Sequence, residues 1–342
     1  MKKLLALTLT VALAFSLSAC AFGNTTAASI IGGSYFLSDS DVMTVGSIDE
    51  TSVYDITYTA AKETPVEFTL SSGSYVTRVY DTERDGVHCY RFDTTLKIEG
   101  SYTLDGTVTP VSDEITTTAD FLGVGSSFKP IYSHRTVNAH TVGYQDKAFT
   151  LDAYVYSVTT TYDHDANKAV VAFEPDEELS SGKFTLAKGE TTYDKVFEKT
   201  YFDNETLLFA IRAFKLTTTF SSSFTSIDAT AKTKRTLTLS SLATVDEAGK
   251  NTSVTEETLP VTYINSGEKI TGADTYRLAL AVGGTYTGSS TILNYAKGGA
   301  KEGQRLIRMQ VPLQLDITAL VSLGKSAAGT FVYTLKSVTK NR

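Results

Sequence analysis

Residues 307–317 read IRMQVPLQLDI, and this stretch decides the class of fold. Apolar side chains occupy every odd position from Ile307 to Ile317, and Arg, Gln, Pro, Gln and Asp fill the even positions between them. Strict alternation of this kind predicts a β-strand with one buried face and one solvent-facing face. Pro312 falls on the polar face and has no N–H to donate to a ladder, so we expect a sheet edge or a bulge there.

The same period of two recurs along most of the chain from about residue 50. Turn-forming sequences such as ERDG, DHDAN and NSGEK separate runs such as YVTRVYD, VHCYRFDTTLKIEG and TYRLALAVGG. Thr supplies 53 of the 342 residues, which is typical of strands with exposed and half-buried faces. The sequence therefore predicts a mainly β protein, built as a large antiparallel meander of long strands.

One segment, YFDNETLLFAIRAF at residues 201–214, departs from this pattern. Its apolar residues recur at helical spacing: Leu207, Leu208, Ile211 and Phe214. An apolar helix face must be buried, and a curved sheet is the partner that this sequence offers. We expect one central helix near 203–214, with Asp203 or Asn204 as its N-cap. The preceding TTYDKVFEKTY could form either an extension of this helix or a strand.

The first twenty residues have the organisation of an export signal. Lys2 and Lys3 give a positive start, and the apolar run 4–17 would span roughly 21 Å as a helix, short of a ~30 Å hydrocarbon core. The run ends in LSAC at residues 17–20, which resembles the lipobox of bacterial lipoproteins. That resemblance implies that the signal is removed, that Cys20 receives a diacylglyceryl group, and that the protein is extracytoplasmic and anchored to a membrane by lipid. The alternative is an ordinary secretory signal with an unrelated cysteine.

Three regions follow from these features. Residues 1–19 form the signal peptide, 20–45 form the lipidated N-terminus and a flexible tether of small and polar residues, and 46–342 form the β-rich domain. A faint internal similarity allows two related half-sheets, about 46–190 and 215–342, around the helix.

Lipidation of Cys20 would leave Cys89 without a partner for a disulfide within the chain. We interpret Cys89 as a small buried side chain, because the adjacent His88 would point to the opposite face of a strand. Stability must then come from a packed core and not from cross-links.

The long meandering strands, the central DNETLLFAIR helix and the lipobox together resemble the LolA/LppX-like half-barrel superfamily. The resemblance spans roughly residues 50–342 as a pattern, without a diagnostic motif. It implies a curved, unclosed half-barrel sheet wrapped around the helix. It also implies an apolar groove for acyl chains between the sheet and Leu207, Leu208, Ile211 and Phe214. This chain is longer than the compact carriers of that superfamily and has one clear helix.

The sequence contains no motif that identifies an enzyme or a cofactor site. Its net charge of −7 argues against nucleic acid as a partner. Asp163, Asp165, Asn167 and Glu174 occupy positions 1, 3, 5 and 12 of a calcium-loop pattern, but Lys168 replaces the required Gly and the flanks read as strands. We therefore interpret this stretch as a hairpin turn, and we expect no metal, no cofactor and no catalysis.

Two functions fit these features. The first, which we favour from the sequence, is a binding module of the cell envelope that holds a lipid or another apolar ligand on the concave face of its sheet. The second is a structural or adhesive surface protein that binds another envelope protein through strand faces rich in Thr and Tyr. The first predicts a space between helix and sheet, and the second predicts a contact surface on the outside.

Overall fold

The computed structural model describes residues 49–61, 66–122, 129–145, 148–184, 187–198, 201–202, 204–214, 216–228, 232–242, 256–282, 291–297, 305–313 and 329–340. The predicted signal peptide, Cys20 and the tether lie outside these ranges. Within them, no helix has the length and apolar character needed to cross a membrane. Most of the described chain is strand, so the predicted mainly β class is confirmed.

All the strands belong to one fifteen-stranded sheet. Their bounds are β1 Asp49–Ala60, β2 Glu67–Arg84, β3 Val87–Leu104, β4 Thr107–Leu122, β5 Lys129–Gln145, β6 Ala148–Asp163, β7 Lys168–Pro175, β8 Gly189–Asp194, β9 Ser221–Asp228, β10 Thr233–Ser241, β11 Glu256–Asn265, β12 Glu268–Val282, β13 Thr291–Ala296, β14 Leu306–Pro312 and β15 Gly329–Lys340. The order across the sheet is β8-β7-β6-β5-β4-β3-β2-β1-β15-β14-β13-β12-β10-β9, and β11 pairs with both β12 and β15.

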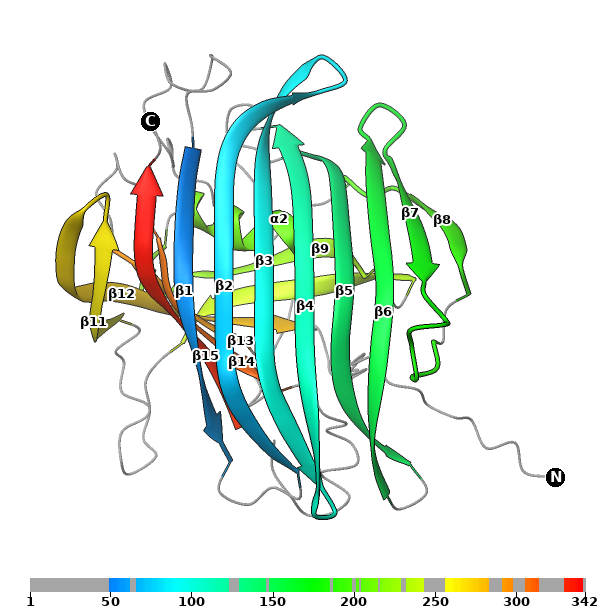
Figure 1. The fold of residues 1–342 in the computed structure, drawn as a ribbon. Coiled ribbons are helices and arrows are strands. Elements are labelled where there is room, and N and C mark those ends of the chain that lie inside the picture. The colour runs from blue at the N-terminus through cyan, green and yellow to red at the C-terminus, as the bar shows by residue number, and fades with distance from the viewer. Residues whose placement is uncertain are drawn as a thin grey trace.

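The first half of the sheet is the predicted meander. Consecutive strands from β1 to β8 pair antiparallel, and β2 and β3 are each 18 residues long. In Figure 1, β1–β6 lie side by side across the front of the molecule. Burial alternates as the sequence predicts: on β3, Phe92, Ile98 and Tyr102 are buried, while Lys97 and Glu99 are exposed.

Two tight turns set the register of the longest strands. Asp85-Gly86 joins β2 to β3, and Asp105-Gly106 joins β3 to β4. All four residues have positive φ, between 47° and 80°, as two-residue hairpin turns of type I′ require. Because a slip of one residue would turn every side chain to the other face, these turns fix which side chains point into the core.

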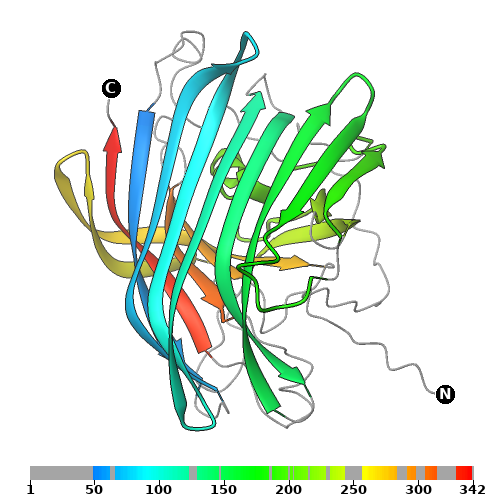
Figure 2. The same ribbon diagram turned by 45° about the vertical axis from the view of Figure 1, so that its right-hand side comes forward.

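The second half of the sheet corrects the prediction of an unclosed half-barrel, because β11–β15 close into a five-stranded barrel. β12, β13, β14 and β15 pair in that order, and β11 pairs with β12 and, in parallel through Ile264 and Asn265, with β15. The register of β11 shifts between Leu259 and Thr262, and Gly272 in β12 has φ 78°. Irregularities of this kind bend a strand pair, and Figure 2 shows the β11–β12 hairpin curling toward β15.

The stretch that predicted the fold forms a shorter strand than its pattern suggested. Ile307 and Met309 are buried as predicted, but β14 ends at Pro312. Pro312 pairs with β15, while the pairing of β14 with β13 ends at Gln310. The proline therefore stands where the ladder loses one of its two neighbours, in agreement with its missing N–H. Residues 314–317 lie outside the described chain.

The predicted central helix lies between β8 and β9 in the sequence. α2 spans Asn204–Ala210, and the 3₁₀ helix η2 continues it over Ile211–Ala213. In both ribbon views the helix lies behind the long strands. The TTYD sequence before it, for which two structures were open, belongs to strand β8.

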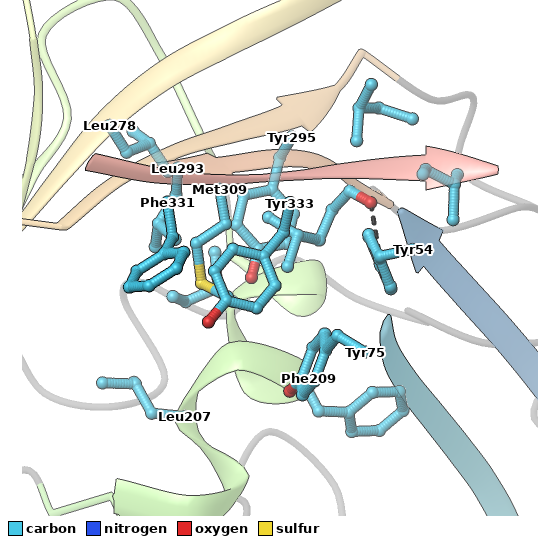
Figure 3. Close-up of a cluster of buried hydrophobic side chains, with 14 of the residues drawn as sticks. Tyr54, Tyr75, Leu207, Phe209, Leu278, Leu293, Tyr295, Met309, Phe331 and Tyr333 are labelled. Carbon is cyan, nitrogen blue, oxygen red and sulfur yellow. Dashed lines mark hydrogen bonds between the residues drawn. The ribbon is translucent and has the colours of Figure 1, made fainter. Parts of the chain in front are cut away.

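The main core lies between the long strands, the helix and the barrel strands. Figure 3 shows Tyr54 and Tyr75 of the meander and Phe209 of α2 facing side chains of the barrel, such as Tyr333. Phe209 also stacks on Phe92, with ring centroids 5.4 Å apart. The helix is therefore held by aromatic contacts on the concave face of the meander.

A second apolar cluster joins the two ends of the sheet. Val171 of β7, Tyr193 of β8 and Ile227 of β9 belong to it. Tyr201 adds an isolated bridge to Thr225 of β9. In the part of the chain that the structure describes, β8 and β9 are thus joined by side-chain packing and not by a ladder between them.

Candidate functional site

Three of the four residues predicted to line an apolar groove are part of the packed core. Leu207, Ile211 and Phe214 are 2%, 0% and 1% exposed, so the protein's own side chains fill the space between helix and sheet at these positions. Of the four, Leu208 is partly exposed. A lipid bound between helix and sheet stays a prediction, and it would require these side chains to move.

A small cavity remains beside Leu208. Its volume is about 30 Å³, and it lies between α2, the strands β1–β3 and the start of β14. Its lining combines apolar and aromatic residues with polar and charged ones: Tyr54, Tyr75, Val79, Phe92, Leu208, Phe209 and Leu306, then Glu50, Ser52, Thr77, Arg212 and Arg305. One water molecule needs about 10–15 Å³ of such volume. The cavity therefore has room for about two waters or a group of that size, and not for an acyl chain.

Three charged side chains meet at this cavity. Arg212, in η2, donates from Nη1 to Oε1 of Glu50 at 2.6 Å and from Nη2 to Oε2 at 3.3 Å. Arg305, just before β14, donates from Nη2 to Oε2 of Glu50 at 3.4 Å. The three residues are 9% exposed or less. The fold thus assembles one buried ionic cluster from the first strand, the helix and the barrel.

The carboxyl group of Glu50 stays ionised in this cluster. Burial would raise its pKa, but the charge and hydrogen bond of Arg212, with the charge of Arg305, outweigh burial and lower the pKa to about 2. Burial also opposes the charge on Arg212, and the carboxylate of Glu50 outweighs that effect, so the pKa of Arg212 is raised. Two positive groups and one negative group therefore coexist at neutral pH.

Two buried tyrosines fix the walls around the cluster. Tyr54 donates its hydroxyl to the carbonyl oxygen of Leu306 at 2.9 Å, and Tyr295 donates to that of Leu208 at 2.5 Å. Burial raises the pKa of both phenols, so they remain donors at neutral pH. The second bond satisfies a carbonyl near the end of α2, where helices leave such groups without intrahelical partners.

A larger depression lies over β4–β6 at the end of β7. Its volume is about 750 Å³, within the range of roughly 300–1,000 Å³ that is typical of ligand sites. It is lined by hydroxyl and amide groups, by carboxylates and by a few apolar side chains: Thr116, Thr136, Asn138, Ser157, Glu114, Glu174, Asp176, Glu177, Glu178, Val137, Val155, Tyr156 and Pro175. Lysines pair with two of the carboxylates, Lys97 with Glu114 at 3.3 Å and Lys188 with Glu174 at 2.6 Å.

The acidic side of this depression is an ordered turn. Asp176 accepts backbone hydrogen bonds from residues 178 and 179 through Oδ1, at 3.1 and 3.0 Å. The hydroxyls of Ser180 and Ser181 accept the N–H groups of Val155 and Ala153, at 2.9 and 2.8 Å. These hydroxyls take the place of a neighbouring strand along this part of β6, so the rim of the depression is fixed to its floor.

The residues of the calcium-like pattern do not come together. Asp163, Asp165 and Asn167 lie at the hairpin turn between β6 and β7, as interpreted from the sequence. Glu174 lies on β7, seven residues beyond Asn167 and about 23 Å away at ~3.3 Å per residue, where it pairs with Lys188. In the ranges that the structure describes, no group of three or more His, Cys, Asp or Glu side chains is placed to hold a metal ion.

Cys89 is buried, as interpreted from the sequence, with 1% exposure. Burial, with a smaller contribution from the charge of Asp120, raises the pKa of its thiol to about 11. A thiol with so high a pKa is a poor nucleophile at neutral pH. Asp120 also accepts hydrogen bonds from Arg84 and Arg91, which makes a second ionic cluster.

Glu50, Arg212 and Arg305 were not among the site residues predicted from the sequence. The available signal was Arg212, which interrupts the apolar sequence FAIRAF and so places a cation on a helix that must be buried. Its two partners lie 162 and 93 residues away and carry no local pattern, so their meeting depends on the topology of the whole sheet.

No model of a known protein family matches the sequence, and no curated protein matches it. Among solved structures, the chain is similar to a beta-barrel-like protein of the domain of unknown function DUF1849 from Brucella abortus. The TM-score is 0.41 and the identity 11%, over 86% of this chain and 98% of that chain. A likeness at this level carries no argument about this chain.

Proposed function

We propose that this protein is a lipid-anchored, extracytoplasmic binding module, and that the depression over β4–β6 holds a basic, extended segment of another envelope protein. The observation that supports this choice is the contrast in size between the two spaces. The depression measures about 750 Å³ and the cavity beside the helix about 30 Å³. This reverses the preference from the sequence alone, because the concave face is largely filled.

The lining of the depression suits a polar polypeptide. The hydroxyl of Ser157 and the amide of Asn138 offer donors and acceptors to a backbone and its side chains. The hydroxyls of Thr116 and Thr136 hydrogen-bond to each other and add acceptor oxygens. The acidic turn at residues 176–178 adds negative charge, which favours Lys or Arg on the partner and speeds its approach at low salt.

The test uses two fluorescent decapeptides, one alternating Lys with Ser and the other alternating Glu with Ser. We expect the purified protein to bind the first and not the second, and the double variant Glu177→Gln/Glu178→Gln to lose binding by tenfold or more. The matched control is Glu67→Gln/Glu268→Gln, which removes two exposed acids outside the depression. Equal loss in both double variants would show a general attraction to an acidic protein and overturn the proposal.

The anchor has its own test. Two acyl chains on Cys20 give stable attachment, whereas a single chain holds only reversibly. We expect Cys20→Ser to move the protein from the membrane fraction to the soluble fraction. Retention of Cys20→Ser in the membrane fraction would mean that something other than lipid on this residue holds the protein.

A lipid on the concave face is the second candidate. The apolar residues Tyr75, Phe92 and Leu208 in the lining of the cavity favour it, and an acyl chain would fit there once the core side chains of the helix move. Mass spectrometry of the protein purified under native conditions is the test. A stoichiometric lipid would support this candidate, and its absence, with a packed helix, would remove it.

A further inference from the structure

The cluster of Glu50, Arg212 and Arg305 carries a surplus charge in a place where water screens poorly. Two guanidinium groups face one carboxylate, so these three groups sum to one positive charge. The side chains of the arginines are 9% and 7% exposed. Buried charges are costly unless they are paired, so this cluster favours the arrival of an anion.

Arg305 has a donor to offer that anion. Its hydrogen bond to Glu50 is 3.4 Å long, against 2.6 Å for the shorter hydrogen bond of Arg212. Its Nε is buried and donates no hydrogen bond within the described structure. Guanidinium groups bind carboxylates best through two parallel N–H donors in one plane. Arg305 therefore lines the cavity with a guanidinium group whose Nε–H is available to a ligand.

The cavity itself sets the size of the anion. Its volume of about 30 Å³ suits a group about as large as two waters. Thr77 lies in the same lining, and its hydroxyl can donate to a second oxygen, whereas the hydroxyl of Ser52 bonds to Tyr54. Tyr75 and Phe92 also line the cavity, whose small volume leaves no room for a sugar or an acyl chain.

We propose that this cavity is a binding site for a small carboxylate, with Arg305 as its main donor and Arg212 beside it. The site is separate from the depression over β4–β6, because the two linings share no residue. Either proposal can therefore fail without the other.

The first experiment uses the wild-type protein and two probes of the same shape, acetate and acetamide. Urea unfolding is measured in sodium acetate, in sodium chloride of equal ionic strength, and in chloride with acetamide. At acetate tenfold above its dissociation constant, the ratio of folded to unfolded protein should rise about elevenfold over chloride, and acetamide should leave it unchanged. Equal effects of acetate and acetamide, or of acetate and chloride, would mean that the cavity holds only water and would overturn the proposal.

The second experiment compares two Arg→Lys variants that keep the charge and remove the fork. Arg305→Lys should weaken the binding of ¹³C-acetate, followed by NMR titration, by tenfold or more. The matched control is Arg308→Lys in β14, because the Nε of Arg308 is also buried and without a partner among the described residues, but Arg308 does not line the cavity. Unchanged affinity in Arg305→Lys, or the same loss in both variants, would contradict the proposal. If Arg305→Lys does not fold, the wild-type comparison of acetate with acetamide decides the matter.

Discussion

Two ionic clusters in this protein each place two arginines around one carboxylate. They differ in how far the arginine side chains are exposed to solvent. In the cluster on β2–β4, Asp120 is 0% exposed and accepts hydrogen bonds from Arg84 and from both Nε and Nη2 of Arg91. The side chains of these arginines are 27% and 24% exposed. The guanidinium of Arg84 also lies 3.6 Å from the ring centroid of Tyr132.

In the cluster beside the helix, Glu50 binds Arg212 and Arg305, whose side chains are only 9% and 7% exposed. Solvent can screen the surplus charge on β2–β4, whereas the surplus charge beside the helix stays in the interior, next to a cavity. The same three charges therefore make a structural cluster in one place and a candidate anion site in the other. Access to water decides between these roles.

The largest expected effect comes from removing the carboxylate of the interior cluster. Glu50→Gln leaves two buried guanidinium groups without a counter-charge, so we expect a loss of about 3–5 kcal/mol in the free energy of unfolding. Urea denaturation followed by circular dichroism measures it. A loss below about 1 kcal/mol would show that the interior cluster is as well screened as the one on β2–β4.

The pH dependence of stability gives the next largest effect. The pKa of Glu50 is lowered from 4.5 to about 2, so its contribution is present above pH 4.5 and is lost as the pH falls toward 2. The shift corresponds to about 3 kcal/mol. Unfolding at a series of pH values should show this loss in the wild type and not in Glu50→Gln. Parallel curves for the two proteins would contradict the assignment.

A smaller effect is expected in the other cluster. Asp120→Asn keeps an acceptor oxygen but removes the charge, and the partly exposed Arg84 and Arg91 can turn to water. We expect a loss of about 1–3 kcal/mol, less than that of Glu50→Gln measured in the same buffer. The comparison fails if Asp120→Asn is the more damaging of the two.

The smallest effect tests the aromatic support of Arg84. Tyr132→Leu removes the ring under the guanidinium, which we expect to reduce stability by about 0.5–1 kcal/mol. A double-mutant cycle with Arg84→Gln isolates the interaction from other effects of the lost ring. A coupling energy of zero between Arg84 and Tyr132 would show that the ring does not stabilise the cluster on β2–β4, and the two clusters would then differ in solvent exposure alone.

Local patterns in the sequence predicted the elements of this fold well. Alternation along IRMQVPLQLDI and VHCYRFDTTLKIEG predicted strands, and both ERDG and the hairpin stretch DHDAN were read correctly as turns. The helical spacing of Leu207, Ile211 and Phe214 placed the helix and its buried face. These features depend on residues close together in the chain, which is why a sequence can show them.

Features made by distant residues could not be predicted in the same way. Closure of the barrel depends on a bulge near Thr262 and on Gly272 with positive φ, and neither changes the alternating pattern around it. The packing of Phe209 against Phe92 and Phe121 on the concave face had no local sequence signal, and the expected apolar groove stays a prediction that would require such side chains to move. The cluster of Glu50 with Arg305 joins residues 255 positions apart.

The pairing of β1 with β15 has a consequence for folding during synthesis of the chain. The ladder from Glu50 opposite Lys340 to Ala60 opposite Gly329 unites segments separated by about 270 residues. At a synthesis rate of about 5–20 residues per second, β15 is synthesised about 13–54 s after β1, and until then one edge of β1 stays unpaired. A chain that ends before β15 would expose the edges of β1, β11 and β14 that normally pair with β15. Unfinished copies should thus adhere to one another, and only completed chains can hide these edges.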